Sequence, residues 1–278
     1  MTSLLKNRLF VAVALLCTFA SFQAKGDIFT SCGIDLGAAG RTKIWGAFSL
    51  GGGMSINNLS GNSYIQGDVG IAGNGNITLS GGATIYGDLY YHTGGTLHNG
   101  GHITGGIHND AASDALLNQA VIDANNASAA AFALPVSPQY QGLTNVNLSG
   151  HGMTLILASG PCTVLRLNNF ILSGGSTFTL QGTANQGIII NVTNQFTLSG
   201  GSKILLTGGL TWDDVLFNVV GTGKNPELSG GSNIMSGILM ATQRKVVISG
   251  GSIVYGEVIN NGLDLSGGSA IITQATNP

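Results

Sequence analysis

The five-residue stretch Leu172-Ser173-Gly174-Gly175-Ser176 decides the fold of this chain, because it recurs through the C-terminal half. Copies that begin with Leu or Ile follow at intervals of 26, 30, 20 and 17 residues. The copies are Leu172–Ser176, Leu198–Ser202, Leu228–Ser232, Ile248–Ser252 and Leu265–Ser269. Repeats of this length with variable insertions are typical of a solenoid of stacked coils.

The composition agrees with a solenoid of short strands and tight turns. The 278 residues include 45 glycines but only 10 basic and 12 acidic side chains, and 43% of the residues are hydrophobic. This apolar content is sufficient for a continuous core. The formal net charge of -2 argues against nucleic acid as a partner, since a phosphate-binding surface needs clustered Lys and Arg.

The first 24 residues are predicted to be an export signal. Lys6 and Arg8 form a basic end, Leu9–Ala20 is an apolar run, and small residues around Ala24 offer a cleavage site. The uncharged run is shorter than the roughly 20 residues that a membrane helix needs. We therefore expect a protein that is secreted or held at the cell surface, with residues 27–278 forming one domain and no membrane span in the mature chain.

Two cysteines, Cys32 and Cys162, remain after cleavage of such a signal. In an oxidising compartment an isolated pair is usually bridged. A bridge would attach the N-terminal segment to the start of the C-terminal coils. The alternative is two separately buried thiols.

Each C-terminal coil contains three short strands whose alternating side chains define three faces. The paired glycines can adopt backbone angles that are closed to other residues, so they allow a sharp turn between the second and third faces. A triangular cross-section follows. On the first face the outward positions are predicted to be apolar, and on the third face the inward positions are predicted to be Phe178, Ile204, Ile234, Val254 and Ile271.

One segment departs from the strand pattern. From about residue 110 to residue 133, alanine replaces glycine, and apolar residues recur at helical spacing: Leu117, Ala120, Val121, Ala124, Ala127 and Ala131. Asn109 or Asp110 is suited to cap the start of a helix, and Pro135 follows its end. We expect this helix to cover the outward apolar residues of the first face, namely Leu165, Ile189, Leu216, Leu239 and Ile259.

This order of elements resembles the microbial ice-binding family, most clearly at His108–Ala131 and Asp213–Leu265. The resemblance implies a discontinuous right-handed β-solenoid with one long α-helix along one face. It also implies that the N-terminal coils stack next to the C-terminal coils. An open flat face would bind ice, and no cofactor would be needed.

The resemblance also indicates candidate ice-contacting residues. The family pattern, Thr followed by Ala or Gly, any residue, and Thr or Asn, occurs at Thr93–Thr96 and Thr222–Asn225, and the repeated phrase matches it with serine instead of threonine. Serine keeps the hydroxyl but lacks the methyl group, so we expect weak activity. The candidate residues are Thr93, Thr96, Ser173, Ser176, Thr197, Ser199, Ser202, Ser229, Ser232, Ser249, Ser252, Ser266 and Ser269.

Other functions receive less support from the sequence. The histidines at 92, 98, 102 and 108 are expected on different faces, which disfavours a metal site. Asp68 and Asp88 are expected to cap one corner of neighbouring coils, and no catalytic group is apparent, so an enzyme is not expected. An adhesin that binds an extracellular glycan or protein remains the alternative to an ice-binding protein, because a fold does not determine function.

Overall fold

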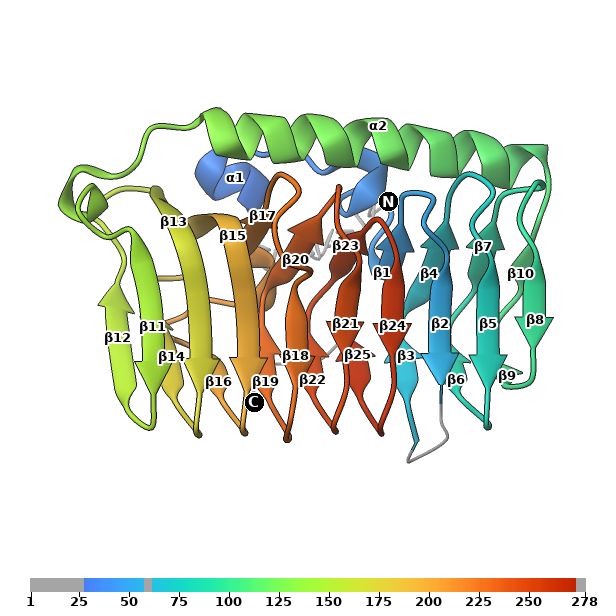
Figure 1. Cartoon of the computed structure of the whole chain (residues 1–278). Coiled ribbons are helices and arrows are strands. Elements are labelled where there is room, and N and C mark those ends of the chain that lie inside the picture. The colour runs from blue at the N-terminus through green and yellow to red at the C-terminus, as the bar shows by residue number, and fades with distance from the viewer. Residues whose placement is uncertain (1–27, 58–61, 274–278) are drawn as a thin grey trace, which may run out of the picture.

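The chain winds into a stack of three-sided coils (Figure 1). The computed structural model describes residues 28–57 and 62–273. The strands are parallel and form a sheet of 16 strands and a sheet of nine. The larger sheet bends around one corner, because β13 (Cys162–Ser173) and β15 (Gly187–Ser199) run across two faces. The prediction of a β-solenoid is confirmed.

We name the three faces of the stack by what lies on them. The helix face contains the first halves of β13 and β15 with β17 (Val215–Val219), β20 (Ile238–Ala241), β23 (Val258–Asn260), β1 (Trp45–Ser49), β4 (Asp68–Ile71), β7 (Leu89–Tyr91) and β10 (Ile107–His108). The serine face contains the second halves of β13 and β15 with β11 (Asn145–Ser149), β18 (Glu227–Ser229), β21 (Val246–Ile248), β24 (Leu263–Leu265), β2 (Met54–Asn57), β5 (Ile77–Ser80) and β8 (Leu97–Asn99).

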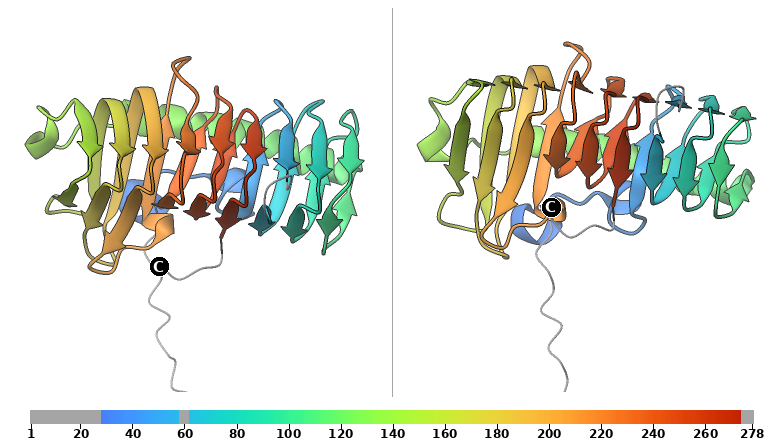
Figure 2. Two further views of the ribbon diagram at one scale, coloured as in Figure 1. Left: turned by 60° about the horizontal axis from the view of Figure 1, so that its bottom comes forward. Right: turned by 90° about the horizontal axis from the view of Figure 1, so that it is seen from below.

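The third face is the nine-stranded sheet. In spatial order it contains β12 (Gly152–Ile156), β14 (Thr177–Gln181), β16 (Lys203–Thr207), β19 (Ile234–Ser236), β22 (Ile253–Tyr255), β25 (Ala270–Ile272), β3 (Tyr64–Gln66), β6 (Thr84–Tyr86) and β9 (His102–Ile103). Seen from below, the strands of the serine face and third face lie in front of the long helix (Figure 2).

The order of coils in space differs from their order in sequence. The N-terminal strands β1, β2 and β3 pair with the last C-terminal strands β23, β24 and β25 on one side. On the other side they pair with β4, β5 and β6. The solenoid is therefore discontinuous, and the N-terminal block extends the C-terminal stack as the resemblance implied.

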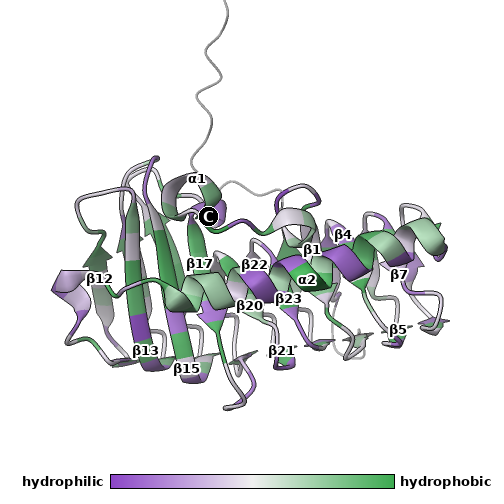
Figure 3. Ribbon diagram, turned by 90° about the horizontal axis from the view of Figure 1, so that it is seen from above, coloured by the Kyte–Doolittle hydropathy of each residue, from purple (hydrophilic) through white to green (hydrophobic). Residues whose placement is uncertain are grey.

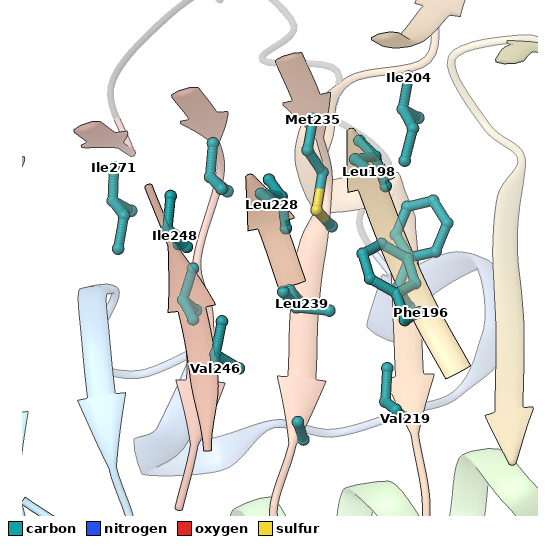
Figure 4. Packing of buried hydrophobic residues seen from close by; sticks show 14 of the residues in the cluster. Phe196, Leu198, Ile204, Val219, Leu228, Met235, Leu239, Val246, Ile248 and Ile271 are labelled. Carbon is teal, nitrogen blue, oxygen red and sulfur yellow. The ribbon is translucent and has the colours of Figure 1, made fainter. Parts of the chain in front are cut away.

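Apolar side chains from all three faces fill the interior (Figure 4). Three phenylalanines form part of this core, with the rings of Phe170 and Phe196 stacked at 5.3 Å between centroids and that of Phe217 5.5 Å from Phe170. Burying such a side chain contributes about 1.5 to 3 kcal/mol. A single coil buries too few of them to be stable alone, so stacking is required.

The long helix α2 (Ala111–Ala133) lies along the helix face (Figure 3). Its N-cap is Asp110, whose carboxylate accepts a hydrogen bond from the backbone N–H of Ser113 at 2.8 Å. Its buried side includes the predicted alanines and Leu117. Within residues 28–57 and 62–273, no helix is both long and apolar enough to cross a membrane.

Two asparagines fix the helix on the strands. The Asn218 side-chain N–H donates to the carbonyl of Ser128 at 2.9 Å, and the Ser128 hydroxyl donates to Asn218 Oδ1 at 2.7 Å. Asn191 donates to the carbonyl of Ala131 at 3.0 Å. Because all of these groups are buried and paired, they set the position of α2 along the stack.

Several predicted side-chain directions are wrong. Leu165 and Leu239 point into the solenoid, and Val164 and Ile238 belong instead to the apolar cluster between the strands, α2 and the N-terminal segment. On the third face Met235 points inward in place of Ile234 (Figure 4). Strands that are apolar on both sides carry no signal for their phase, and a shift of one residue exchanges the two sides.

The N-terminal segment lies beside α2 on the helix face. It comprises α1 (Ile28–Cys32) and the short 3₁₀ helix η1 (Gly37–Ala39), and the N–H of Ala38 donates to Asp123 of α2 at 2.7 Å. Cys32 and Cys162 are joined in a disulfide, so the predicted bridge is confirmed. Two further 3₁₀ helices, η2 (Pro138–Tyr140) and η3 (Trp212–Asp214), lie in connections. The proposed signal, residues 1–24, is outside the described residues.

Glu257 is buried where the two blocks of coils meet. Its Oε1 accepts a hydrogen bond from the N–H of Trp45 at 2.8 Å, which links β1 to the residue before β23. Burial raises the pKa of Glu257 well above its ordinary value, and the negative charge of Asp213 acts in the same direction, whereas the Trp45 hydrogen bond opposes it. The carboxyl group is therefore more easily protonated in the folded chain than in the unfolded chain.

This shift predicts that the protein loses stability as the pH rises. A carboxyl whose pKa is higher in the folded state than in the unfolded state stabilises the fold fully at a pH below its unfolded-state pKa. That stabilisation is lost as the pH rises toward the folded-state pKa. The largest slope from one group is about 1.4 kcal/mol per pH unit. Glu257→Gln keeps an oxygen for Trp45 and removes the ionisation. Melting temperatures from pH 4 to pH 9 should therefore fall less steeply for this variant, and parallel curves would contradict the assignment.

Candidate functional site

The first serine of each repeated phrase forms a continuous row on the serine face. Ser149 pairs with Ser173, and Ser199 pairs with Ser229, in parallel register. The residue before each serine is paired in the same way in the other coils: Leu172 with Leu198, Leu228 with Ile248, and Ile248 with Leu265. The row therefore continues through Ser249 and Ser266. Adjacent strands are about 4.7 to 4.9 Å apart, so hydroxyl groups recur at that interval. We call this row the serine ladder.

A second outward row lies beside the serine ladder. In the first three coils it consists of Asn147, Ile171 and Thr197, which are aligned across β11, β13 and β15. Further along, it continues through Glu227, Val247 and Asp264. The part of the serine face on β11, β13 and β15 therefore has no charged side chain at these positions, unlike the part that follows. We call it the neutral sector.

The hydroxyl groups in the neutral sector share one orientation. Ser173 Oγ donates to the carbonyl of Leu148 at 3.3 Å, and Ser199 Oγ donates to the carbonyl of Leu172 at 3.4 Å. Each proton is thus directed to the preceding coil, and the oxygen lone pairs are available to water. Ser229 breaks the pattern, because its hydroxyl donates to Glu227 Oε1 at 2.6 Å.

The second serine of the phrase is not on the surface, which corrects four of the predicted contacts. Ser176, Ser202, Ser252 and Ser269 are fully buried at the corner between the serine face and the third face. Ser202 Oγ donates to the carbonyl of Ser199 at 2.7 Å, and the N–H of Ser252 donates to Ser269 Oγ at 3.1 Å. These serines hold the corners together and cannot contact an external ligand.

The glycines between the two serines explain this burial. Gly174 and Gly175 have φ angles of 60° and 75°, in the left-handed region, and the other copies repeat the pattern. Two successive left-handed residues turn the chain so that the serine after them points inward. A Cβ at Gly200 would also lie 3.0 Å from the backbone nitrogen of Gly174, so coils approach closely here.

One copy of the phrase has an additional residue at its corner. Ser232 is exposed at the turn, and Asn233 occupies the buried position instead. Asn233 Oδ1 accepts from the N–H of Ser202 at 3.0 Å, and its amide donates to Ser252 Oγ at 3.0 Å. This insertion also shifts the following strand by one residue, which places Met235 in the core.

Neither threonine predicted from the N-terminal block lies in the neutral sector. Thr93 donates its hydroxyl to Asp114 of α2 at 2.7 Å, and this hydrogen bond lowers the pKa of Asp114. Thr93 therefore holds the start of the helix. Thr96 is exposed just before β8, in the outermost N-terminal coil, far along the stack from β11.

The Thr222–Asn225 motif forms an exposed corner loop between β17 and β18, outside the strands of the serine face. Buried Arg244 supports this loop by donating to the carbonyls of Gly221 at 2.7 Å and Lys224 at 2.8 Å. Burial lowers the pKa of Arg244. The loop therefore has a structural explanation that does not require a ligand.

Charge and shape change along the serine face. Lys245 Nζ lies 2.6 Å from Asp264 Oδ2, so an ion pair follows exposed Glu227. Next to it is an open depression of about 420 Å³ lined by glycines, Asn76 and Thr78. The neutral sector combines regular register with freedom from charge at the outward positions of three successive strands.

Sequence reasoning missed one of the three strands of this sector. Asn145, Asn147 and Ser149 lie on β11 and extend both outward rows by one coil. The side chain of Asn169 donates to Asn145 Oδ1 at 2.9 Å, which orders the edge of the sector. The signal was the segment Leu148-Ser149-Gly150, a shortened copy of the repeated phrase.

The aspartates and histidines that the sequence analysis set aside as catalytic or metal-binding residues have structural roles. Asp68 accepts from the N–H of Asp88 at 2.8 Å, and Asp88 accepts from the N–H of Gly106 at 2.7 Å, which confirms that they cap one corner. His92 Nε2 lies 3.7 Å from Asp114, whereas His108 Nε2 lies 3.4 Å from Asp88. In the described part of the chain, no three His, Cys, Asp or Glu side chains gather as a metal site would require.

The sequence profile of the ice-binding-like family matches residues 50–266, which form most of the solenoid. The chain belongs to the ice-binding-like family. This family is not one of enzymes, in agreement with the sequence prediction. No curated protein sequence matches the chain significantly.

Solved structures of ice-binding proteins share the fold of this family member. The protein of the Antarctic ascomycete Antarctomyces psychrotrophicus is 21% identical with a TM-score of 0.56, over 87% of this chain and 99% of that chain. A protein from an Arctic yeast is 17% identical with a TM-score of 0.60, over 87% and 95%. One from Shewanella frigidimarina is 16% identical with a TM-score of 0.58, over 87% and 98%.

The different positions of the two serines give a test of the corner. Ser252→Ala removes a hydroxyl that donates to the carbonyl of Ser249 and accepts from Asn233, so it should lower the free energy of unfolding by about 1 to 3 kcal/mol. Ser249→Ala, at the outward position, should change it by less than about 0.5 kcal/mol. Urea unfolding of both variants measures the difference, and equal effects would contradict the assignment of the buried row.

Proposed function

We propose that this protein is a secreted ice-binding protein that inhibits ice recrystallisation through the neutral sector of its serine face. The observation that carries the proposal is the row of hydroxyls on β11, β13 and β15, which are in register and uncharged, with those on β13 and β15 oriented alike. The interval between strands, about 4.7 to 4.9 Å, is close to an oxygen repeat in ice. The Arctic yeast protein that shares the fold is described as having antifreeze activity.

Rigidity supports this function. Each contact between a hydroxyl and lattice water is weak. A row of contacts becomes effective when the fold has already met the cost of ordering them. In the neutral sector β13 and β15 have a paired strand on each side, and β11 is paired with β13. The hydroxyl protons of Ser173 and Ser199 are held by backbone carbonyls.

Apolar groups beside the ladder compensate for part of what serine lacks. Serine has no methyl group to hold neighbouring water in a cage. In the adjacent row, Ile171 and Thr197 present methyl groups next to Ser173 and Ser199. The sector therefore combines hydroxyl anchors and apolar surface in two separate rows, whereas a threonine provides both in one side chain. The small number of such pairs is consistent with modest activity.

Secretion is supported by the disulfide and the family. The Cys32–Cys162 bridge requires an oxidising compartment, and ice outside the cell is the ligand implied by the family. We propose that residues 1–24 are the export signal and that residues 27–278 are the mature domain.

A bulky side chain in the neutral sector should abolish activity. Ser173→Tyr and Ser199→Tyr together would hold the ice lattice away from both outward rows, so ice grains should coarsen at the rate of buffer in a recrystallisation assay. Thr179→Tyr is the matched control, since Thr179 is half-buried in the same coil as Ser173 but on the third face. Full activity of the double variant, with loss in the control, would move the ice site to the third face.

Removing the charge that ends the neutral sector should increase activity. Glu227 is aligned with Thr197 and takes the hydroxyl proton of Ser229. Glu227→Thr would extend both rows by one coil and free Ser229 to donate to the preceding carbonyl. We expect the concentration needed to inhibit recrystallisation to fall about two- to fivefold, for a gain near 0.5 to 1 kcal/mol. Lys203→Thr on the third face is the control, and an equal gain there would show that removal of any charged side chain raises activity, whichever face carries it.

A further inference from the structure

The third face carries a second feature that ice binding does not use. Three of the six tyrosines of the chain point outward from it: Tyr255 on β22, Tyr64 on β3 and Tyr86 on β6. Tyr86 is 52% exposed, and the other two are half-buried. The rings of Tyr64 and Tyr86 meet edge to face at 5.8 Å between centroids.

The surface around these tyrosines is neutral. The outward residues of the five neighbouring strands β19, β22, β25, β3 and β6 include no charged side chain. Ser236 and Ala270 are buried, and the accessible residues are Ile234, Ile253, Tyr255, Ile272, Tyr64, Gln66, Thr84 and Tyr86. Lys203 borders this strip on one side and His102 on the other. We call it the tyrosine strip.

The size and shape of the tyrosine strip limit what can bind it. Five strands about 4.8 Å apart and about 10 Å long cover on the order of 250 Å². A stable interface between two proteins buries about 800 Å² per partner, so the strip is too small for a second copy of the chain. Its strands already have neighbours on both sides, which excludes addition of a peptide strand. A narrow ligand that runs across the strands remains.

The arrangement of the rings matches a chain of sugars. Tyr255 and Tyr86 occupy one row across the strands, with Ile272 and Gln66 between them, and are therefore about 14 Å apart. This is comparable with the length of three pyranose rings in an extended β-linked chain. Tyrosine offers an apolar ring face and a hydroxyl, Gln66 lies in the row between the two rings as a hydrogen-bonding group, and Tyr64 and Thr84 lie beside that row.

We propose that the tyrosine strip binds a neutral, extended β-linked polysaccharide whose sugar rings stack on Tyr255 and on Tyr86, with the ring of Tyr64 supporting Tyr86 edge to face. The neutrality of the strip disfavours acidic polymers, and the protruding ring of Tyr86 is unsuited to a flat ice lattice. Because the strip and the neutral sector are on different faces, the protein can bind the polysaccharide and leave its ice face open. This inference does not depend on the ice activity.

Depletion assays with insoluble cellulose and chitin test the proposal. The mature chain should be removed from solution by at least one of these polymers. Tyr64→Ala with Tyr86→Ala should weaken the apparent affinity about tenfold or more, whereas the paired Phe variants should retain most of it because the rings remain. Soluble heparin, as an acidic polymer, should not compete. Thr179→Ala is the control on the same sheet, and unchanged melting temperatures verify that the variants are folded.

Four results would overturn the proposal. The mature chain could fail to bind either polymer, or the Ala variants could bind as well as the original chain. Light scattering could instead show a dimer that the Ala variants lose, which would assign the tyrosine strip to self-association. The ice recrystallisation assay on the same variants is an independent measurement. Loss of inhibition in the tyrosine variants would place ice on this face and would overturn both assignments.

Discussion

The structure depends on the parallel, in-register stacking of coils through backbone hydrogen bonds. Every strand takes its position from the coil beside it, so a residue at one corner is repeated at the same corner about 4.8 Å away. Paired left-handed glycines permit this repetition, because they let successive corners approach closely without a Cβ between them. A sequence repeat thereby becomes a row of identical groups on a surface.

The same constraint gives the two serines of one phrase opposite roles. The serine before the glycines faces water, whereas the serine after them is buried and bonds to the carbonyl of the first. The hydrogen bonds of the buried row keep the corner rigid, and the corner fixes the strand that ends at the outward serine. The surface row owes its regularity to the buried one, which is why both are repeated together.

Much of the fold follows from the sequence, because glycine pairs, strand length and the alanine-rich helix each have a local physical cause. The three faces, a helix from about residue 110 to 133 capped by Asn109 or Asp110, and the disulfide were predicted, and the structure shows the helix at 111–133 with Asp110 as its cap. The errors share one reason. Leu165, Leu239 and Met235 lie in strands that are apolar on both sides. Ser176 follows a Gly-Gly turn, and the alternation of inward and outward side chains does not continue through that turn. In these places the pairing with the neighbouring coil decides whether a side chain points into the core or toward solvent.

The discontinuity of the solenoid gives a role to the buried carboxyl that lies where the blocks meet. The N-terminal coils stack on the edge that β23, β24 and β25 form at the end of the C-terminal block. This junction lacks chain connection, so it needs specific contacts, and buried Glu257 with Trp45 provides one. A buried carboxyl is costly unless it is neutral and paired. The Glu257–Trp45 contact adds to the strand pairing that sets one register between the blocks, and that register aligns the serine face over its full length.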